Sequence, residues 1–320
     1  MRIETPSGHA PGRRVVAISI GIIVVVWALN FIAAKIGLQH LPPLTMASFR
    51  IVAGGAVMVP IYLLCRRLPM FQEAARASRS GFTGRDFWTF LYLGFFGVAI
   101  NQSCFTIGLH YTSVSHSAVI VGIGPIYTLV LAVLLRVEQA TWRKASGMAI
   151  AFAGIALLTS ENGLSAHSPS LLGDAITMVG SLGFAMYAVL GKRVANKYDT
   201  LTMSAFNHFA GALLLLPLAI REARAMGPAA NWRAVPWESW ASTLYMAVFG
   251  GAVALILYFW LLRYLEASQL SAFTYLLPIT ATILGILWLG EKGSWGQVFG
   301  GSLALAGVYW VESGRPSETT

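Results

Sequence analysis

The sequence has few charged residues, and this shortage argues against a soluble globular protein. Asp, Glu, Lys and Arg make up 11% of the chain against 56% hydrophobic residues, whereas soluble domains carry about 25% charged residues. Acidic residues are the scarcer kind, with 13 Asp and Glu against 22 Lys and Arg. No stretch is long and polar enough to cover a large soluble core. We therefore expect a protein embedded in a lipid bilayer.

Signatures of enzymes and metal sites are also missing. The two cysteines, Cys65 and Cys104, both lie in apolar segments, and their spacing indicates neither a metal site nor a disulfide framework. The sequence contains no phosphate-binding glycine loop, no Gly-x-Ser-x-Gly elbow, no His-Glu-x-x-His motif and no pair of intramembrane aspartates. We predict no enzyme activity, no metal and no cofactor.

Long apolar runs are what the sequence has in abundance. Runs of about 20 residues, the length that crosses roughly 30 Å of hydrocarbon, recur along the whole chain. They predict an all-α polytopic membrane fold of ten transmembrane helices, five in each half of the chain. The predicted spans are residues 15–37, 44–65, 87–109, 114–135, 141–159, 170–191, 201–220, 238–262, 268–289 and 294–312.

The second half of the chain repeats the first. Matching residues in the later part of each half lie 153 positions apart, as Pro125 and Pro278 do. Earlier in each half the separation is 157, as between Lys35 and Lys192. Because each copy holds an odd number of spans, the second copy must be inverted in the membrane relative to the first. Inverted repeats of this kind are typical of secondary transporters.

The repeat divides the chain into five parts. We predict a cytoplasmic tail at 1–14, a first repeat at 15–160, a linker at 161–169, a second repeat at 170–312 and a second cytoplasmic tail at 313–320. The small-residue pairs Gly147 with Ala151 and Gly300 with Ala304 let helices approach closely. They fit either packing within the chain or a homodimer interface, and the sequence does not separate the two.

The basic residues lie mostly in loops on one predicted side of the membrane. Five of them fall between Arg66 and Arg85. The positive-inside rule then places both chain ends in the cytoplasm. Arg221, Arg224 and Arg233 are the exception, because their loop is predicted outside. The net charge of +9 thus reports membrane topology and not nucleic-acid binding.

Pro125 and Pro278 lie near the middle of the fourth and ninth predicted spans. A proline lacks the N–H that would bond the carbonyl four residues earlier, so the carbonyls of Val121 and Thr274 lose a donor. Helix breaks at matching places of two repeats point to a central substrate site. A static packing kink explains the same residues.

Arg50 lies about two turns into the second predicted span, and its counterpart in the repeat is Asn207. A cation at membrane depth is costly and is often functional. One interpretation is that the guanidinium binds a carboxylate or phosphate of the substrate. The other is that Arg50 extends to the outer headgroups or caps helix carbonyls.

The other polar and aromatic side chains at membrane depth carry little charge. Together they predict a cavity suited to amphipathic or zwitterionic small molecules, although each one alone fits a packing role. No carboxylate falls at the centre of a span. Glu138 and Glu291 instead precede helix starts, where they could accept backbone N–H groups. The candidate cavity residues besides Arg50 are Trp27, Asn30, Asn101, Gln102, Tyr187, His208, Tyr258 and Tyr275.

These motifs resemble those of EamA-type transporters of the drug/metabolite transporter superfamily. The resemblance rests on Trp27-Ala28-Leu29-Asn30-Phe31, Ala47-Ser48-Phe49-Arg50, and the paired prolines and glutamates of the two halves. It implies ten helices in two inverted five-helix repeats around a central cavity. It also implies the export of amino acids and their derivatives, nucleosides, pigments or toxic cations.

We therefore predict a multi-pass secondary transporter of the inner (plasma) membrane that exports small amphipathic metabolites by alternating access. Its expected partners are a small-molecule substrate and the lipid bilayer, and not nucleic acid. An uptake permease of the same fold and a non-transporting polytopic membrane protein are the alternatives. The sequence leaves the substrate, the direction and the coupling ion open.

Overall fold

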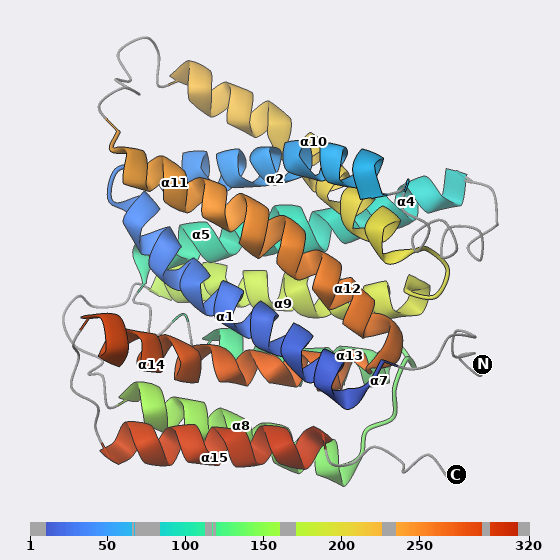
Figure 1. Ribbon diagram of the computed structural model, residues 1–320, viewed down its shortest axis with the longest axis vertical. Helices are drawn as coiled ribbons and strands as arrows, with labels where there is room; N and C mark the ends of the chain where they lie inside the picture. The colour runs from blue at the N-terminus through green and yellow to red at the C-terminus, as the bar shows by residue number, and fades with distance from the viewer. Residues whose placement is uncertain are drawn as a thin grey trace.

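The computed structural model describes residues 11–65, 67, 84–112, 117, 120–160, 171–225, 235–289 and 295–312. All regular secondary structure within these residues is helical (Figure 1). The predicted linker 161–169, the tail 313–320, most of the first tail and Glu291 lie outside the described residues.

The described helices divide between the two halves of the chain. The first half contains α1 (Arg13–Leu38), α2 (Pro43–Cys65), α4 (Gly84–Leu93), the π-helix η1 (Gly94–Ile100), α5 (Asn101–Tyr111), α7 (Gly124–Leu134) and α8 (Trp142–Ser160). The second half contains α9 (Leu171–Val194), α10 (Thr200–Ala225), α11 (Trp237–Tyr245), the π-helix η3 (Met246–Val253), α12 (Ala254–Tyr264), α13 (Ala267–Ala272), the 3-10 turn η4 (Phe273–Tyr275), α14 (Leu276–Leu289) and α15 (Trp295–Glu312).

Six helical stretches within the described residues are long and apolar enough to cross a membrane. They are α1, α2, the continuous α4–η1–α5, α9, residues Thr200–Glu222 of α10, and the continuous α11–η3–α12. These six confirm the corresponding predicted spans. Helices also occupy the four other predicted ranges, where α7, α8, α13 to α14, and α15 lie.

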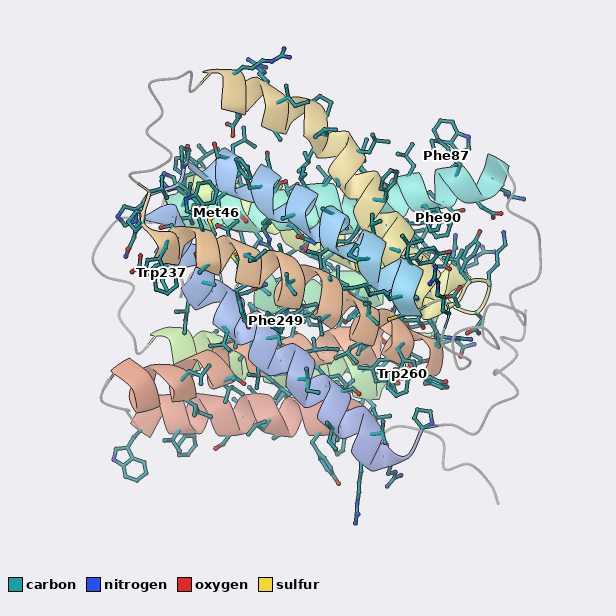
Figure 2. All side chains as sticks on the ribbon, turned by 45° about the horizontal axis from the view of Figure 1, so that its top comes forward. Met46, Phe87, Phe90, Trp237, Phe249 and Trp260 are labelled. Atoms are coloured by element: carbon teal, nitrogen blue, oxygen red, sulfur yellow. The ribbon has the colours of Figure 1, made fainter. Side chains whose placement is uncertain are left out.

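The outer surface of the bundle suits a bilayer. Large apolar side chains are exposed along its sides, and tryptophans are exposed where helices begin, with Trp142 83% and Trp295 85% exposed. Figure 2 shows Trp237, at the start of α11, and Phe87, at the start of α4, at opposite ends of the bundle. Aromatic residues at both ends of an apolar surface are typical of membrane–water interfaces.

α8 and α15 lie side by side at one edge of the bundle (Figure 1). Their backbones approach so closely that a Cβ added to Gly154 would lie 2.4 Å from the backbone nitrogen of Ala304. A Cβ added to Gly307 would lie 2.4 Å from the backbone nitrogen of Ala151. The small residues that fitted either internal packing or a homodimer therefore form a contact inside the chain.

This contact leaves no room for a side chain at position 154. Gly154→Ala should lower the free energy of unfolding by about 1–3 kcal/mol, the usual cost of overpacking. Gly21→Ala is the matched control, because a Cβ at Gly21 meets nothing within 4 Å. Thermal unfolding in detergent should show a loss for Gly154→Ala alone, and equal melting temperatures would contradict the packing.

Candidate functional site

A cavity lies where helices of the two halves of the chain meet. Its volume is about 100 Å³, measured as the space open to the centre of a water molecule. Its wall is mostly apolar with a few polar groups, as is usual for small-molecule sites. The lining residues are Trp27, Asn30, Phe31, Arg50, Asn101, Gln102, Phe105, Val121, Gly124, Ser181, Phe184, Gly250, Leu255, Ser271, Thr274 and Leu277.

Five of the predicted site residues line this cavity, namely Trp27, Asn30, Arg50, Asn101 and Gln102. Two of them are fixed by bonds to backbone carbonyls of other helices. The indole Nε1 of Trp27 donates to the Gly250 carbonyl at 3.1 Å, and Nδ2 of Asn101 donates to the Gly180 carbonyl at 3.0 Å. These bonds hold the two side chains in place before any ligand arrives.

Arg50 is buried beside the cavity, which favours the interpretation that it faces a ligand over the one in which it extends to the outer headgroups. Its exposed fraction is 3%. Nη1 donates to the hydroxyl of Thr106 at 3.2 Å, and the guanidinium lies 5.9 Å from the ring centre of Phe105. Its Nε has no hydrogen-bond partner among the described residues.

The other four predicted residues lie behind the cavity wall, so their direct contact with substrate is not supported. The Tyr187 ring packs on Gly97, and Tyr258 packs behind Trp27 with ring centres 5.9 Å apart. His208 is buried and its Nδ1 lies 3.0 Å from the Ser204 carbonyl. Tyr275 points to α8, where its hydroxyl donates to the Met148 carbonyl at 3.2 Å. Packing against distant helices decides these directions.

Sequence reasoning missed the aromatic side chains Phe31, Phe105 and Phe184. Phe184 is the repeat counterpart of Trp27, and their rings meet edge to face at 5.6 Å. The repeat alone could therefore have identified Phe184. Phe31 and Phe105 meet in the same way at 5.0 Å. Phe105 is the repeat counterpart of the predicted Tyr258, and Phe31 ends the motif that begins with Trp27, so the sequence carried a signal for each.

The two prolines lie next to the cavity and not on it. Val121 and Thr274, whose carbonyls lack the i+4 donor, both line the cavity. The helices are irregular at both places, since α7 begins at Gly124 and the 3-10 turn η4 precedes α14. The helices are thus interrupted near both prolines, with backbone beside the cavity.

The π-helices η1 and η3 occupy matching positions in the two halves, and each brings a glycine against a helix that borders the cavity. A Cβ added to Gly97 would lie 2.2 Å from the Tyr187 ring, and one added to Gly250 would lie 2.3 Å from Asn30 Nδ2. Tyr187 and Asn30 are themselves 157 apart. Short π-helical segments occur frequently at functional sites.

A polar cluster around Glu138 joins the two halves where α7 ends and α13 begins. The Ser268 backbone N–H donates to Glu138 Oε1 at 3.1 Å, and the Ser268 hydroxyl donates to Oε2. Nζ of Lys144 lies 3.0 Å from Glu138 and 2.7 Å from Glu266. Glu138 thus binds a helix start as predicted, but that of α13 and not of the helix that follows it.

A second ion pair joins α4 to the loop after α9. Nζ of Lys197 lies 2.5 Å from Oδ1 of Asp86, which also accepts a hydrogen bond from the Tyr198 hydroxyl. The hydrogen bond to Asp86 raises the pKa of Lys197 above its usual value. The Lys197 side chain is 42% exposed, whereas that of Asp86 is 1% exposed.

The model of the EamA-like transporter family matches residues 15–160 and again residues 171–313. The chain belongs to the EamA-like transporter family. Its two halves are two EamA repeats, as the sequence resemblance implies. This membership identifies the cavity as a candidate transport site, and transporters are not enzymes.

Curated relatives in this family share about a quarter of their residues with the chain. An uncharacterized transporter of Archaeoglobus fulgidus is 26% identical over 89% of this chain and 93% of its own length. A probable terminal-alkyne amino-acid exporter of Streptantibioticus cattleyicolor is 24% identical over 90% of each chain. The uncharacterized inner membrane transporter YedA of Escherichia coli is 25% identical over 83% of this chain and 80% of its own.

A solved crystal structure shares the fold of this EamA family member. It superposes with a TM-score of 0.71 over 93% of this chain and 96% of that one, at 15% sequence identity. At this identity the likeness supports the fold alone.

Removing Glu138 should destabilise the protein more than removing Glu266. Glu138→Ala leaves the buried Lys144 with one carboxylate partner and removes the acceptor of the Ser268 N–H and hydroxyl. By analogy with broken buried pairs, the free energy of unfolding should fall by about 2–4 kcal/mol. Glu266 is 43% exposed, so Glu266→Ala should cost about 1 kcal/mol or less. Glu138→Gln should fall between them. Melting temperatures in detergent test this order, which equal losses would overturn.

Proposed function

We propose that this protein is a secondary transporter of the inner (plasma) membrane that exports small amphipathic metabolites through the cavity. The observation that carries the proposal is the position of the cavity, between two EamA repeats that both line it. Its wall combines aromatic rings, several hydrogen-bonding groups and one charge. Such a wall suits a small molecule with one polar end.

We further propose that the ten helical segments all span the membrane and that the two repeats are inverted. Two matched contacts support this. Lys35 Nζ donates to the Leu109 carbonyl at 3.2 Å, and Lys192 Nζ donates to the Leu262 carbonyl at 2.8 Å. Lys35 and Lys192 are repeat counterparts, 157 positions apart, and Leu109 and Leu262 are repeat counterparts, 153 positions apart. The two halves therefore make the same contact. The helix packing shows the same exchange between halves. The stretch α4–η1–α5 of the first half packs on α9 and α10 of the second, and its counterpart α11–η3–α12 packs on α1 and α2.

The proposed orientation places both chain ends in the cytoplasm. In Figure 1 the start of α1 and the end of α15 lie at the same end of the bundle, on the right. The loop between α9 and α10, and the place where α7 ends and α13 begins, lie at this end too. The excess of basic residues in the loops of this end supports a cytoplasmic location.

Transport would proceed by alternating access, in which the repeats rock against each other around the cavity. α7 and α13 border the cavity through Gly124 and Ser271, and the Glu138–Ser268 bonds join them at the proposed cytoplasmic end. In this proposal those bonds close the inner end and break when the cavity opens inward. The exporter among the relatives favours export over uptake.

A bulky side chain at Gly124 should block transport without harming the fold. Gly124 lines the cavity, and a Cβ there meets nothing within 4 Å. Gly124→Leu should therefore abolish export, whereas Gly21→Leu, on α1 and away from the cavity, should leave it intact. The measurement compares small molecules in the spent medium of cells producing each protein at equal membrane levels.

Compounds enriched by the wild type and Gly21→Leu but not by Gly124→Leu would identify exported substrates. If the wild type enriches nothing, uptake of a panel of small amphipathic metabolites into inside-out and right-side-out vesicles decides between an importer and a non-transporting protein. Export that survives in Gly124→Leu would contradict transport through this cavity.

Locking α7 to α13 should stop transport reversibly. In a background of Cys65→Ala and Cys104→Ala, the pair Glu138→Cys and Ser268→Cys would be joined by a short bifunctional thiol reagent that a reductant cleaves. We expect export to stop on cross-linking and return on reduction, because the inner end could no longer open. Each single cysteine is the control, and full export by the cross-linked protein would refute this gate.

A further inference from the structure

Arg50 brings a positive charge to the cavity that no described residue neutralises. It forms no ion pair with a described residue, and its polar partner is the neutral hydroxyl of Thr106. None of the lining residues is acidic. A buried charge without a counter-ion is costly. A ligand carboxylate would supply the missing charge and would match the two-pronged geometry of the guanidinium.

Asn30 adds an unpaired hydrogen-bond acceptor, whereas Arg50 supplies donors. It is 6% exposed and lines the cavity, and its Oδ1 has no hydrogen-bond partner among the described residues. The amide lies against Gly250, where an added Cβ would be 2.5 Å from Oδ1 of Asn30. An amide oxygen left alone in an apolar wall needs one N–H or O–H donor.

The aromatic side chains define what the rest of the ligand must be. Trp27, Phe31, Phe105 and Phe184 contribute rings to the wall, and these favour contact with an apolar or aromatic body. A ligand ammonium would instead add a second positive charge to a cavity that holds Arg50 and no lining carboxylate. A free amino acid therefore fits less well than the same molecule with its amine acylated.

Resting on the proposed transport function, we infer that the site selects organic acids with one negative charge, an apolar or aromatic body and a neutral donor. N-acylated amino acids are the simplest members of this class. Their carboxylate would bind Arg50, and their amide N–H would donate to Oδ1 of Asn30. The assignment excludes free amines and permanently cationic compounds as preferred ligands.

A set of four phenylalanine derivatives tests this class on the wild-type protein. N-acetyl-L-phenylalanine is an anion, L-phenylalanine a zwitterion, L-phenylalanine methyl ester mainly a cation near neutral pH, and N-acetyl-L-phenylalaninamide neutral. Calorimetric titration of the purified full-length protein in detergent should show the anion binding at least about tenfold more tightly than the other three. Tenfold corresponds to about 1.4 kcal/mol.

Three variants assign the selectivity to the two residues. Arg50→Gln should weaken binding of the anion about tenfold or more and leave the neutral amide little changed, and Arg50→Lys should restore part of the loss. Asn30→Asp supplies the carboxylate that the cavity lacks. It should therefore reverse the preference, so that phenylalanine binds more tightly than its N-acetyl derivative. Melting temperatures confirm that each variant is folded.

The outcomes separate this inference from the proposed function. Tighter binding of the zwitterion or the cation would overturn the anionic class, and so would a set in which none of the four compounds binds. Either result leaves transport standing if Gly124→Leu still abolishes export of some compound. If the wild type exports nothing and vesicles take up nothing, the proposed function fails as well.

Discussion

Hydrocarbon makes an unpaired charge or polar group costly, and the described charges of this bundle are arranged accordingly. The amines of Lys35 and Lys192 each bond a carbonyl at the end of a neighbouring helix, where the helix dipole favours a cation. Glu138 lies between Lys144 and a helix start. With these groups satisfied at the ends of the helices, Arg50 is left at the cavity without a described counter-ion.

The two repeats share a scaffold but not a binding surface. The glycines of η1 and η3, the paired lysines and the glycines between α8 and α15 recur at fixed separations because they set how closely backbones pack. Residues that border the cavity differ instead. Asn30 corresponds to Tyr187, and Arg50 to Asn207. A symmetric frame therefore holds an asymmetric site, in which the first repeat supplies the charge.

Sequence alone could predict the helices and the repeat, because apolar runs and fixed separations are properties of the chain itself. It also indicated Trp27, Asn30 and Arg50, which lie at polar or interrupted points of apolar helices. It could not predict the direction of Tyr275, which depends on α8, or the partner of Glu138, which lies 130 residues away. Such directions follow from contacts between distant helices.

The π-helices η1 and η3 also change which side chains of α5 and α12 point into the bundle. A π-helical turn holds more residues than an α-helical one, so η1 shifts the angular register of α5 relative to α4 even though the helix is continuous. One residue fewer would turn α5 by about 100°. Asn101 and Gln102 follow η1 directly. The number of residues in η1 therefore sets the rotation of α5 about its own axis. That rotation decides which side chains of α5 face the cavity.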